Sequence, residues 1–356
     1  MRMSKNNGKV SGGNFFNKVL AGLSIGIVVA LVPGALLGEL AKALSPVFPG
    51  AKLIIDMTNL AARMLPMVIG VTVAMQFGFT PIQTASIGIA TVVGSGVSMA
   101  GEKGVFAFTG TGDVINAGIT AAIAVVIVLL LGSKLKAYTI LLVPTIVITV
   151  AGALGLFTLP YIKLITEWIG RIIQNFTLLQ PILMGILTAI AFALLIVSPI
   201  STVGVATAIS LSGIASGAAN LGIVAAGFGL SISGWKSNSV GTSVAHFLGS
   251  PKMQMANFIK KPKMIIPIVC NAAVLGALAG MFNIPGTPMS AGFGISGLIG
   301  PINALNLMSG GWSVTNIMMV TLIFVIIPIL LGFVFNYVFT KVVKLVKPED
   351  YKLKFE

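Results

Sequence analysis

Apolar runs of about 20 residues recur along almost the whole of this 356-residue chain and leave few folds open to it. Only 8% of the residues are charged, against about 25% in average soluble domains. In a bilayer every backbone polar group must find its partner inside the protein, and long apolar helices meet that demand. The sequence therefore predicts an all-α polytopic membrane protein.

The order of the runs predicts about ten transmembrane helices. The first extends from Val19 to Leu44 and is expected to break at Pro33-Gly34, and the others are placed at 53–79, 84–100, 113–131, 138–159, 178–197, 202–232, 239–258, 264–282 and 314–339. The run 239–258 is the weakest of these. Residues 160–175 carry charges at every fourth position and are expected to lie along the membrane surface. The Gly- and Pro-rich stretch 285–311 is expected to be re-entrant or irregular.

The formal net charge of +14 follows from basic residues gathered at helix ends and tails. With ten crossings and a cytoplasmic N-terminus, the basic clusters at 134–136, 260–263 and 341–354 all fall on the inner side, as the positive-inside rule requires. We therefore expect cytoplasmic tails at 1–18 and 342–356 around a membrane domain at 19–341, in a bacterial cell membrane. Lipid orientation accounts for the charge, so no nucleic-acid partner is expected.

Two segments about 133 positions apart share the pattern S-x-x-G-x-K. They are Ser98–Lys103 and Ser231–Lys236, and each ends a Gly-rich apolar run. Similar offsets relate Pro66 to Pro199 and Gly88 to Gly222, and shorter ones relate Pro144 to Pro267. These matches predict two direct repeats, at about 52–160 and 185–285, although Gly- and Ala-rich segments also resemble one another by chance.

The two lysines head the candidate binding residues, because a charge inside a membrane segment is costly and is usually functional. If both Gly-rich hairpins are re-entrant, the two loops lie on the same side of the membrane and share one site near the repeat axis. Free backbone N–H groups there would hold an oxyanion or a hydroxyl. The predicted solute-binding residues are Glu102, Lys103, Trp235, Lys236 and Asn238. The alternative is that both hairpins cross fully and their lysines lie in water.

Three further residues are weaker candidates. Asp113 and Asn116 begin the fourth predicted helix on one face, where Asp113 is better suited to be a helix N-cap than a binding residue. His246 is the only histidine, and it suits a packed or interfacial role at least as well as a role in proton coupling. No nucleophile and base constellation appears, and Cys270 is the only cysteine, so neither catalysis nor a metal or other cofactor is expected.

The segments Phe16–Leu23, Gly94–Lys103, Gly110–Asn116 and Gly234–Ala256 resemble stand-alone EIIC-like membrane proteins of the bacterial phosphotransferase system. Within that family the chain is most similar to type-2 EIIC proteins described as toxin regulators, like the perfringolysin O regulator. The resemblance implies a sugar-translocating unit that works with separate IIA and IIB proteins and forms a homodimer. The chain lacks an obvious form of the Glu-containing sugar-site motifs of the glucose-type and mannitol-type units.

These observations together predict a membrane component that binds and moves a small polar solute, first of all a sugar or sugar derivative. The two lysines also keep organic anions such as sugar acids open. The alternatives are a phosphorylation-independent transporter and a membrane sensor or regulator that moves nothing.

Overall fold

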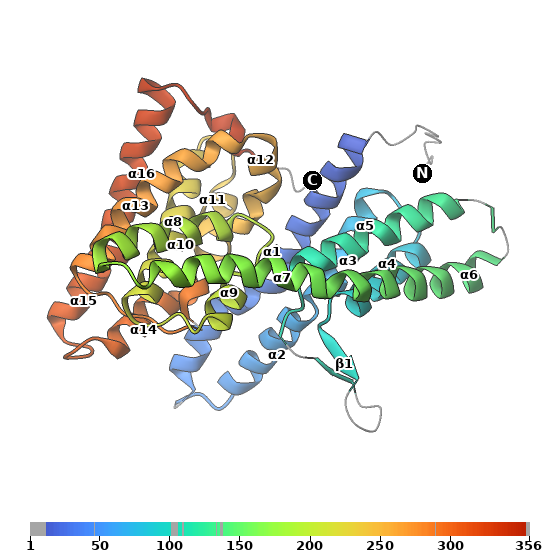
Figure 1. The fold of residues 1–356 in the computed structure, drawn as a ribbon, viewed down its shortest axis with the longest axis horizontal. Coiled ribbons are helices and arrows are strands. Elements are labelled where there is room, and N and C mark those ends of the chain that lie inside the picture. The colour runs from blue at the N-terminus through green and yellow to red at the C-terminus, as the bar shows by residue number, and fades with distance from the viewer. Residues whose placement is uncertain are drawn as a thin grey trace.

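The computed structural model describes residues 12–45, 47–100, 106–108, 110–132, 134–135, 138–288 and 290–353. Its helices form two bundles joined by one long crosswise helix (Figure 1). The first bundle contains α1 (Gly12–Leu44), α2 (Ala51–Arg63), α3 (Leu65–Gln76), α4 (Pro81–Gly94), α5 (Val114–Leu131) and α6 (Thr139–Ile146). A small antiparallel hairpin of β1 (Ser98–Ala100) and β2 (Phe106–Phe108) separates α4 from α5.

The first helix differs from its prediction. It continues for 33 residues through Pro33 instead of breaking there. Membrane helices tolerate an internal proline because neighbouring groups satisfy the carbonyl that it leaves free. The bend occurs in the next predicted span, where α2 and α3 meet at 53°. The two helices join at Met64, just before Pro66, and a proline near the start of a helix restricts the preceding backbone.

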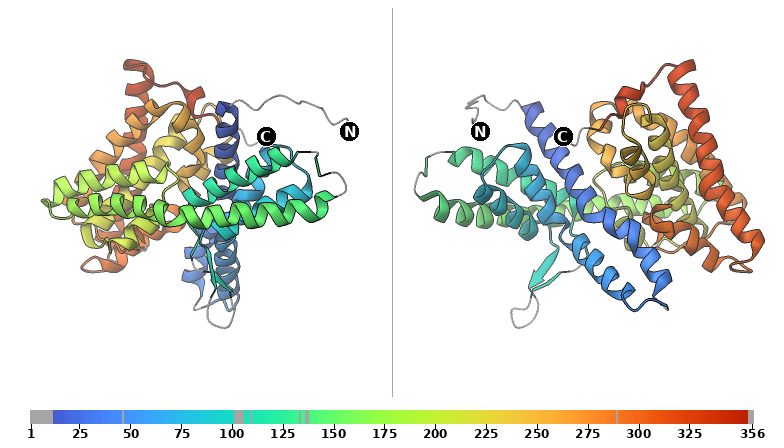
Figure 2. Two further views of the ribbon diagram at one scale, coloured as in Figure 1. Left: turned by 45° about the vertical axis from the view of Figure 1, so that its right-hand side comes forward. Right: turned by 180° about the vertical axis from the view of Figure 1, so that it is seen from behind.

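A single rod of 38 residues, Thr139–Phe176, replaces the predicted fifth span and the separate surface stretch. It consists of α6, a π-helical turn at Val147–Ala151 and α7 (Gly152–Phe176). In Figures 1 and 2 this rod runs across the molecule, from the first bundle to the second. The rod therefore links the two bundles through α7.

The second bundle contains α8 (Pro181–Ile196), α9 (Thr202–Ala208), α10 (Gly213–Gly234), α11 (Val240–Leu248), α12 (Met255–Lys260), α13 (Ile265–Met281), α14 (Ile299–Leu307), α15 (Val314–Thr321) and α16 (Ile327–Tyr337). The stretch between α13 and α14 is irregular, as expected. Polar groups of α10 hold it: the Asn220 Oδ1 accepts the backbone N–H of Gly294 at 3.0 Å, and the Ser216 hydroxyl donates to the Thr287 carbonyl.

Within the described residues, six helices are long and apolar enough to cross a membrane, or seven if the bent α2 and α3 form one span. The expectation of about ten spans is not confirmed. The helices α4 and α8 are apolar but have only 14 and 16 residues. The weak predicted span 239–258 is divided into α11 and α12 by a 3₁₀ turn at Pro251–Gln254. The two direct repeats are likewise not confirmed.

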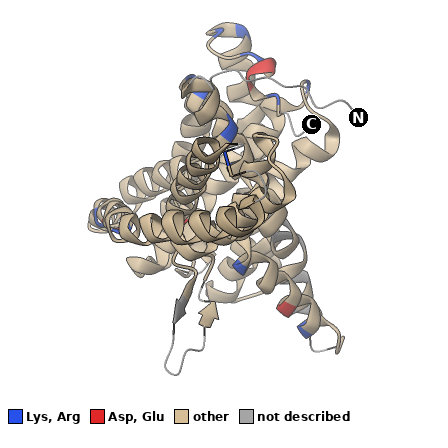
Figure 3. Cartoon of the chain, turned by 90° about the vertical axis from the view of Figure 1, so that its right-hand side faces the viewer, with Lys and Arg blue, Asp and Glu red and all other residues tan. Residues whose placement is uncertain are grey.

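Many of the basic residues gather at the end of the molecule where the C-terminus lies, and a few lie at its side and at the opposite end (Figure 3). The start of α1 lies at this same end (Figures 1 and 2). The exposed lysines of the C-terminal third include Lys260, Lys261, Lys263, Lys341, Lys344 and Lys347. An excess of basic residues at one end is typical of a membrane protein whose basic loops stay mainly in one compartment.

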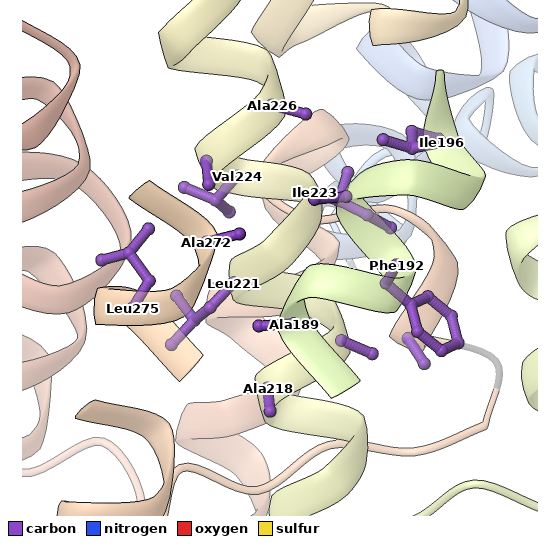
Figure 4. Close-up of a cluster of buried hydrophobic side chains, with 14 of the residues drawn as sticks. Ala189, Phe192, Ile196, Ala218, Leu221, Ile223, Val224, Ala226, Ala272 and Leu275 are labelled. Carbon is purple, nitrogen blue, oxygen red and sulfur yellow. The ribbon is translucent and has the colours of Figure 1, made fainter. Parts of the chain in front are cut away.

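Each bundle has its own hydrophobic core. One comprises buried residues between Val19 and Ala151 together with Met255, and the other runs from Ile173 to Tyr351. Small residues allow the second core to pack tightly where α8, α10 and α13 meet (Figure 4). A Cβ on Gly185 or on Gly276 would overlap the backbone of the other helix. Close backbone approach of this kind is the usual basis of helix packing in membranes.

Candidate functional site

The first S-x-x-G-x-K segment forms part of the β-hairpin. Ser98 pairs with Phe108, and Ala100 pairs with Phe106. Glu102 and Lys103 lie outside the described residues. In Figures 1 and 2 the hairpin projects from the end of the molecule opposite the C-terminus.

The second S-x-x-G-x-K segment ends α10 and holds the C-terminal segment. Trp235 is 48% exposed, and Lys236 is also exposed. The Asn238 Nδ2 donates to the carbonyls of Gly234 at 3.0 Å and Tyr351 at 2.9 Å, while its Oδ1 accepts the Leu353 N–H at 2.8 Å. Asn238 is thus bonded to the protein's own backbone.

The motif glycine has a steric role in the same contact. A Cβ on Gly234 would lie 2.7 Å from the Asn238 amide nitrogen and 3.3 Å from the Tyr351 Cβ. Tyr351 is fully buried beside it. Because the C-terminal segment and the hairpin lie at opposite ends, the described residues do not bring the two S-x-x-G-x-K segments together, and the expectation that both loops lie on one side is not met.

Two more amides bind the backbone of the C-terminal segment. The Gln254 Nε2 donates to the Tyr351 carbonyl at 2.7 Å, and the Asn257 Nδ2 donates to the Lys352 carbonyl at 2.9 Å. Lys261 forms an ion pair with Asp350, which holds the pKa of that carboxyl below its usual range through its hydrogen bond and charge. These contacts attach the C-terminal segment to the turn Pro251–Gln254, to α12 and to Lys261 just after it.

His246 is fully buried under this attachment. Its Nδ1 lies 3.1 Å from the Ser243 carbonyl, and its Nε2 lies 3.1 Å from the Gln254 Nε2. A carbonyl only accepts and an amide nitrogen only donates, so the ring is neutral with its proton on Nδ1. Burial lowers the pKa of His246 to about 4, although hydrogen bonding at Ser243 and Thr242 opposes the shift. His246 is therefore a packed residue whose two ring nitrogens are both engaged.

Asn116 joins three helices inside the first bundle. Its Nδ2 donates to the carbonyls of Gly94 at 2.5 Å and Gly155 at 2.8 Å, and its Oδ1 accepts the Thr158 hydroxyl at 2.7 Å. The neighbouring Asp113 is the N-cap of α5 and accepts the Asn116 N–H at 2.8 Å. Burial raises the pKa of Asp113, and its backbone hydrogen bonds and the charge of Lys163 oppose the rise. Both residues thus stabilise the junction of α4, α5 and α7.

Lys252 is a buried residue that was not among the candidates predicted from the sequence. It is only 5% exposed, and its Nζ donates to the carbonyls of Ser198 and Ile200 at 2.7 Å each, with that of Leu195 at 3.5 Å. Burial lowers the pKa of Lys252 to about 7, and the three acceptors favour the charged form. One signal was present in the sequence: this lysine lies inside the weak run 239–258, which has no acidic residue to pair with it.

A polar cavity of about 290 Å³ lies where the end of α7 meets the loop between α9 and α10. Gln174, Ser210 and Ser212 line it, and their side chains make no hydrogen bond with any described residue. Thr177 adds a hydroxyl, and Met184, Ile209, Leu211, Ile214 and Ala215 supply apolar contacts. No charged residue lines this cavity.

The family model for "Phosphotransferase system, EIIC" matches residues 17–353, nearly the whole chain. The chain belongs to this EIIC family. No curated protein and no solved structure matches it. EIIC proteins are membrane transport components of the phosphotransferase system, in agreement with the apolar helices described above.

The phosphoryl chemistry of an EIIC system needs an accessible acceptor side chain. In this EIIC protein, neither ring nitrogen of His246 is free. Cys270 is half-buried within the apolar helix α13. His246 is thus engaged at both ring nitrogens, and Cys270 lies inside an apolar helix.

Proposed function

We propose that this EIIC protein binds and translocates a neutral, hydroxyl-rich solute, most simply a sugar, at the cavity beside the loop between α9 and α10. The observation that carries the proposal is a cavity whose free polar groups are one amide and two hydroxyls, with no charge among its lining residues. Amide and hydroxyl groups pair with sugar hydroxyls, and the apolar wall suits a sugar's C–H face. Its volume of about 290 Å³ fits a small solute.

The backbone at the cavity supports the same proposal. Ser210 has a φ of +52°, a left-handed conformation that is uncommon for a residue with a side chain. Two hydrogen bonds that close the end of α9 hold this conformation: the Ser210 N–H donates to the Thr207 carbonyl at 3.1 Å, and the Leu211 N–H donates to the Ala206 carbonyl at 2.8 Å. Ser210 follows the C-cap residue Ile209 of the short α9, and it lines the cavity from the loop that leads to α10.

Phosphoryl transfer would then depend on separate proteins of the IIA and IIB type. The basic end of the molecule suits the cytoplasmic side, where such proteins would meet it, and this supports the proposal that both termini are cytoplasmic. The solute would be neutral when it enters the cavity. A sugar acid or phosphate is disfavoured there because no cationic side chain among the lining residues compensates its charge.

The test is a binding measurement on detergent-purified protein with neutral sugars, sugar acids and sugar phosphates. Gln174→Leu and Ser212→Ala should each weaken binding of any neutral sugar that stabilises the wild type. Lys236→Ala, a change at an exposed residue near the C-terminal segment, serves as the matched control and should leave binding unchanged. Loss of binding in Lys103→Ala and Lys236→Ala, with Gln174→Leu unaffected, would instead place the site at the two S-x-x-G-x-K segments.

A further inference from the structure

The ammonium of Lys252 has no anionic partner among the described residues. The ion pair that they contain joins Lys261 to Asp350 instead. Burying a charge without a partner costs several kcal/mol unless other polar groups take the place of water. The three carbonyls of Leu195, Ser198 and Ile200 are the groups that do so here.

These carbonyls match the chemistry of a small cation. An ammonium has three N–H donors and no acceptor, so three carbonyls can satisfy it completely, whereas a neutral amine would leave its lone pair unmet. The carbonyls come from the last turn of α8 and from the unwound residues before α9. The C-terminal end of a helix carries partial negative charge, and unwound carbonyls in transporters coordinate monovalent cations.

The carbonyls and the cation come from different parts of the chain. Residues 195–200 supply the three oxygens, and the turn Pro251–Gln254 supplies the ammonium. A second cavity of about 290 Å³ lies beside this junction, between the end of α8, α12 and the start of α13, and Ser198, whose carbonyl is one of the three, is among its lining residues. Removal of the lysine side chain would leave the oxygens in place, with an adjoining space through which an ion can enter.

We propose that the junction of α8 and α9 is a monovalent-cation site that the chain fills with its own Lys252 ammonium. Truncation of the lysine therefore exposes a latent site for K⁺ or Na⁺. The tethered ammonium fixes the turn Pro251–Gln254 to the end of α8 without any ion from solution.

The experiment measures the thermal unfolding midpoint of the purified protein in choline chloride, with KCl, NaCl or methylammonium chloride substituted at constant ionic strength. The wild type should show the same midpoint in all four salts. Lys252→Ala should have a lower midpoint in choline, because three buried carbonyls lose their donor, and should recover most of the loss in a saturable manner with a small cation. Lys252→Met is the matched control. The methionine side chain fills the space that the lysine chain occupies, so the unfolding midpoint of this variant should fall in choline and should not recover with a small cation.

Two results would overturn the proposal. One is a Lys252→Ala midpoint that is equal in choline, K⁺, Na⁺ and methylammonium. The other is a wild-type response to K⁺ or Na⁺ as large as that of the variant. If Lys252→Ala cannot be purified in choline, its recovery in KCl or methylammonium chloride supports the site. Failure in every salt, while Lys252→Met purifies, contradicts it.

Discussion

The buried histidine should make the stability of the protein depend on pH in one defined window. The pKa of His246 falls from an ordinary 6.5 to about 4 on folding, so the unfolded chain binds more protons between these values. Stability is then complete above pH 6.5, decreases as the pH falls towards 4, and changes no further through this group below that. Each pKa unit corresponds to about 1.4 kcal/mol, so the whole loss is about 3 kcal/mol.

The main reason for this loss is burial, which disfavours the charged ring, and protonation also brings two hydrogen-bond donors face to face. Protonation of His246 places an N–H on Nε2 opposite the Gln254 Nε2, which lies 3.1 Å away and also donates to the Tyr351 carbonyl. We expect Gln254 to turn away and release part of its hold on the C-terminal segment. Acidification should therefore increase cleavage of the chain end by a carboxypeptidase that is active in this pH range.

The assay compares the wild type with His246→Gln, whose amide oxygen can accept from Gln254 but does not titrate. The free energy of unfolding is measured in mixed micelles from pH 7.5 to 4.5, above the range in which the pKa of Asp350 contributes. The wild type should lose most of the 3 kcal/mol, and the variant should lose little. Equal losses in the two proteins would show that His246 is not held neutral by its surroundings, and would refute this reasoning.

Three further substitutions test the packing. Asn116→Leu should lower the unfolding free energy by about 1–3 kcal/mol, because it leaves the buried carbonyls of α4 and α7 without a donor, and an unchanged midpoint would contradict the role of Asn116. Gly185→Ala should lower the unfolding free energy by about 1–3 kcal/mol, because the added Cβ forces α8 away from α13. Gly241→Ala, where a Cβ meets open space, should leave the unfolding free energy unchanged. Equal effects of the two substitutions would argue against the close approach of α8 and α13. Asn238→Leu should speed carboxypeptidase cleavage of the chain end at pH 7.5, and wild-type protection in this variant would show that Asn238 does not hold the C-terminal segment.

Local sequence signals predicted the membrane class, the start of α5 at its N-cap Asp113 and the irregular stretch after α13. Hydropathy and capping depend on neighbouring residues, so these features are visible without the fold. Hydropathy alone could not show that the run 239–258 is too broken to cross a membrane. The turn at Pro251–Gln254 is held there by a contact between Lys252 and the distant end of α8.

The candidate site was harder to predict for the same reason. The S-x-x-G-x-K pattern at 231–236 was singled out from the sequence as part of a solute site, but its glycine and the nearby Asn238 contact Tyr351, more than a hundred positions away. Nothing in the motif itself indicates that partner. The polar cavity likewise combines Gln174 and Ser210 from segments separated by the whole of α8, and its lining contains no motif.

Solute binding to the purified protein tests the central claim most directly. A thermal-shift titration with neutral sugars, sugar acids and sugar phosphates should find at least one neutral sugar that raises the unfolding midpoint in a saturable manner. The account predicts that Gln174→Leu weakens this response and that Lys236→Ala retains it. Stabilisation by anionic ligands alone, or full retention of the sugar response in Gln174→Leu, would contradict a neutral solute site beside the loop between α9 and α10.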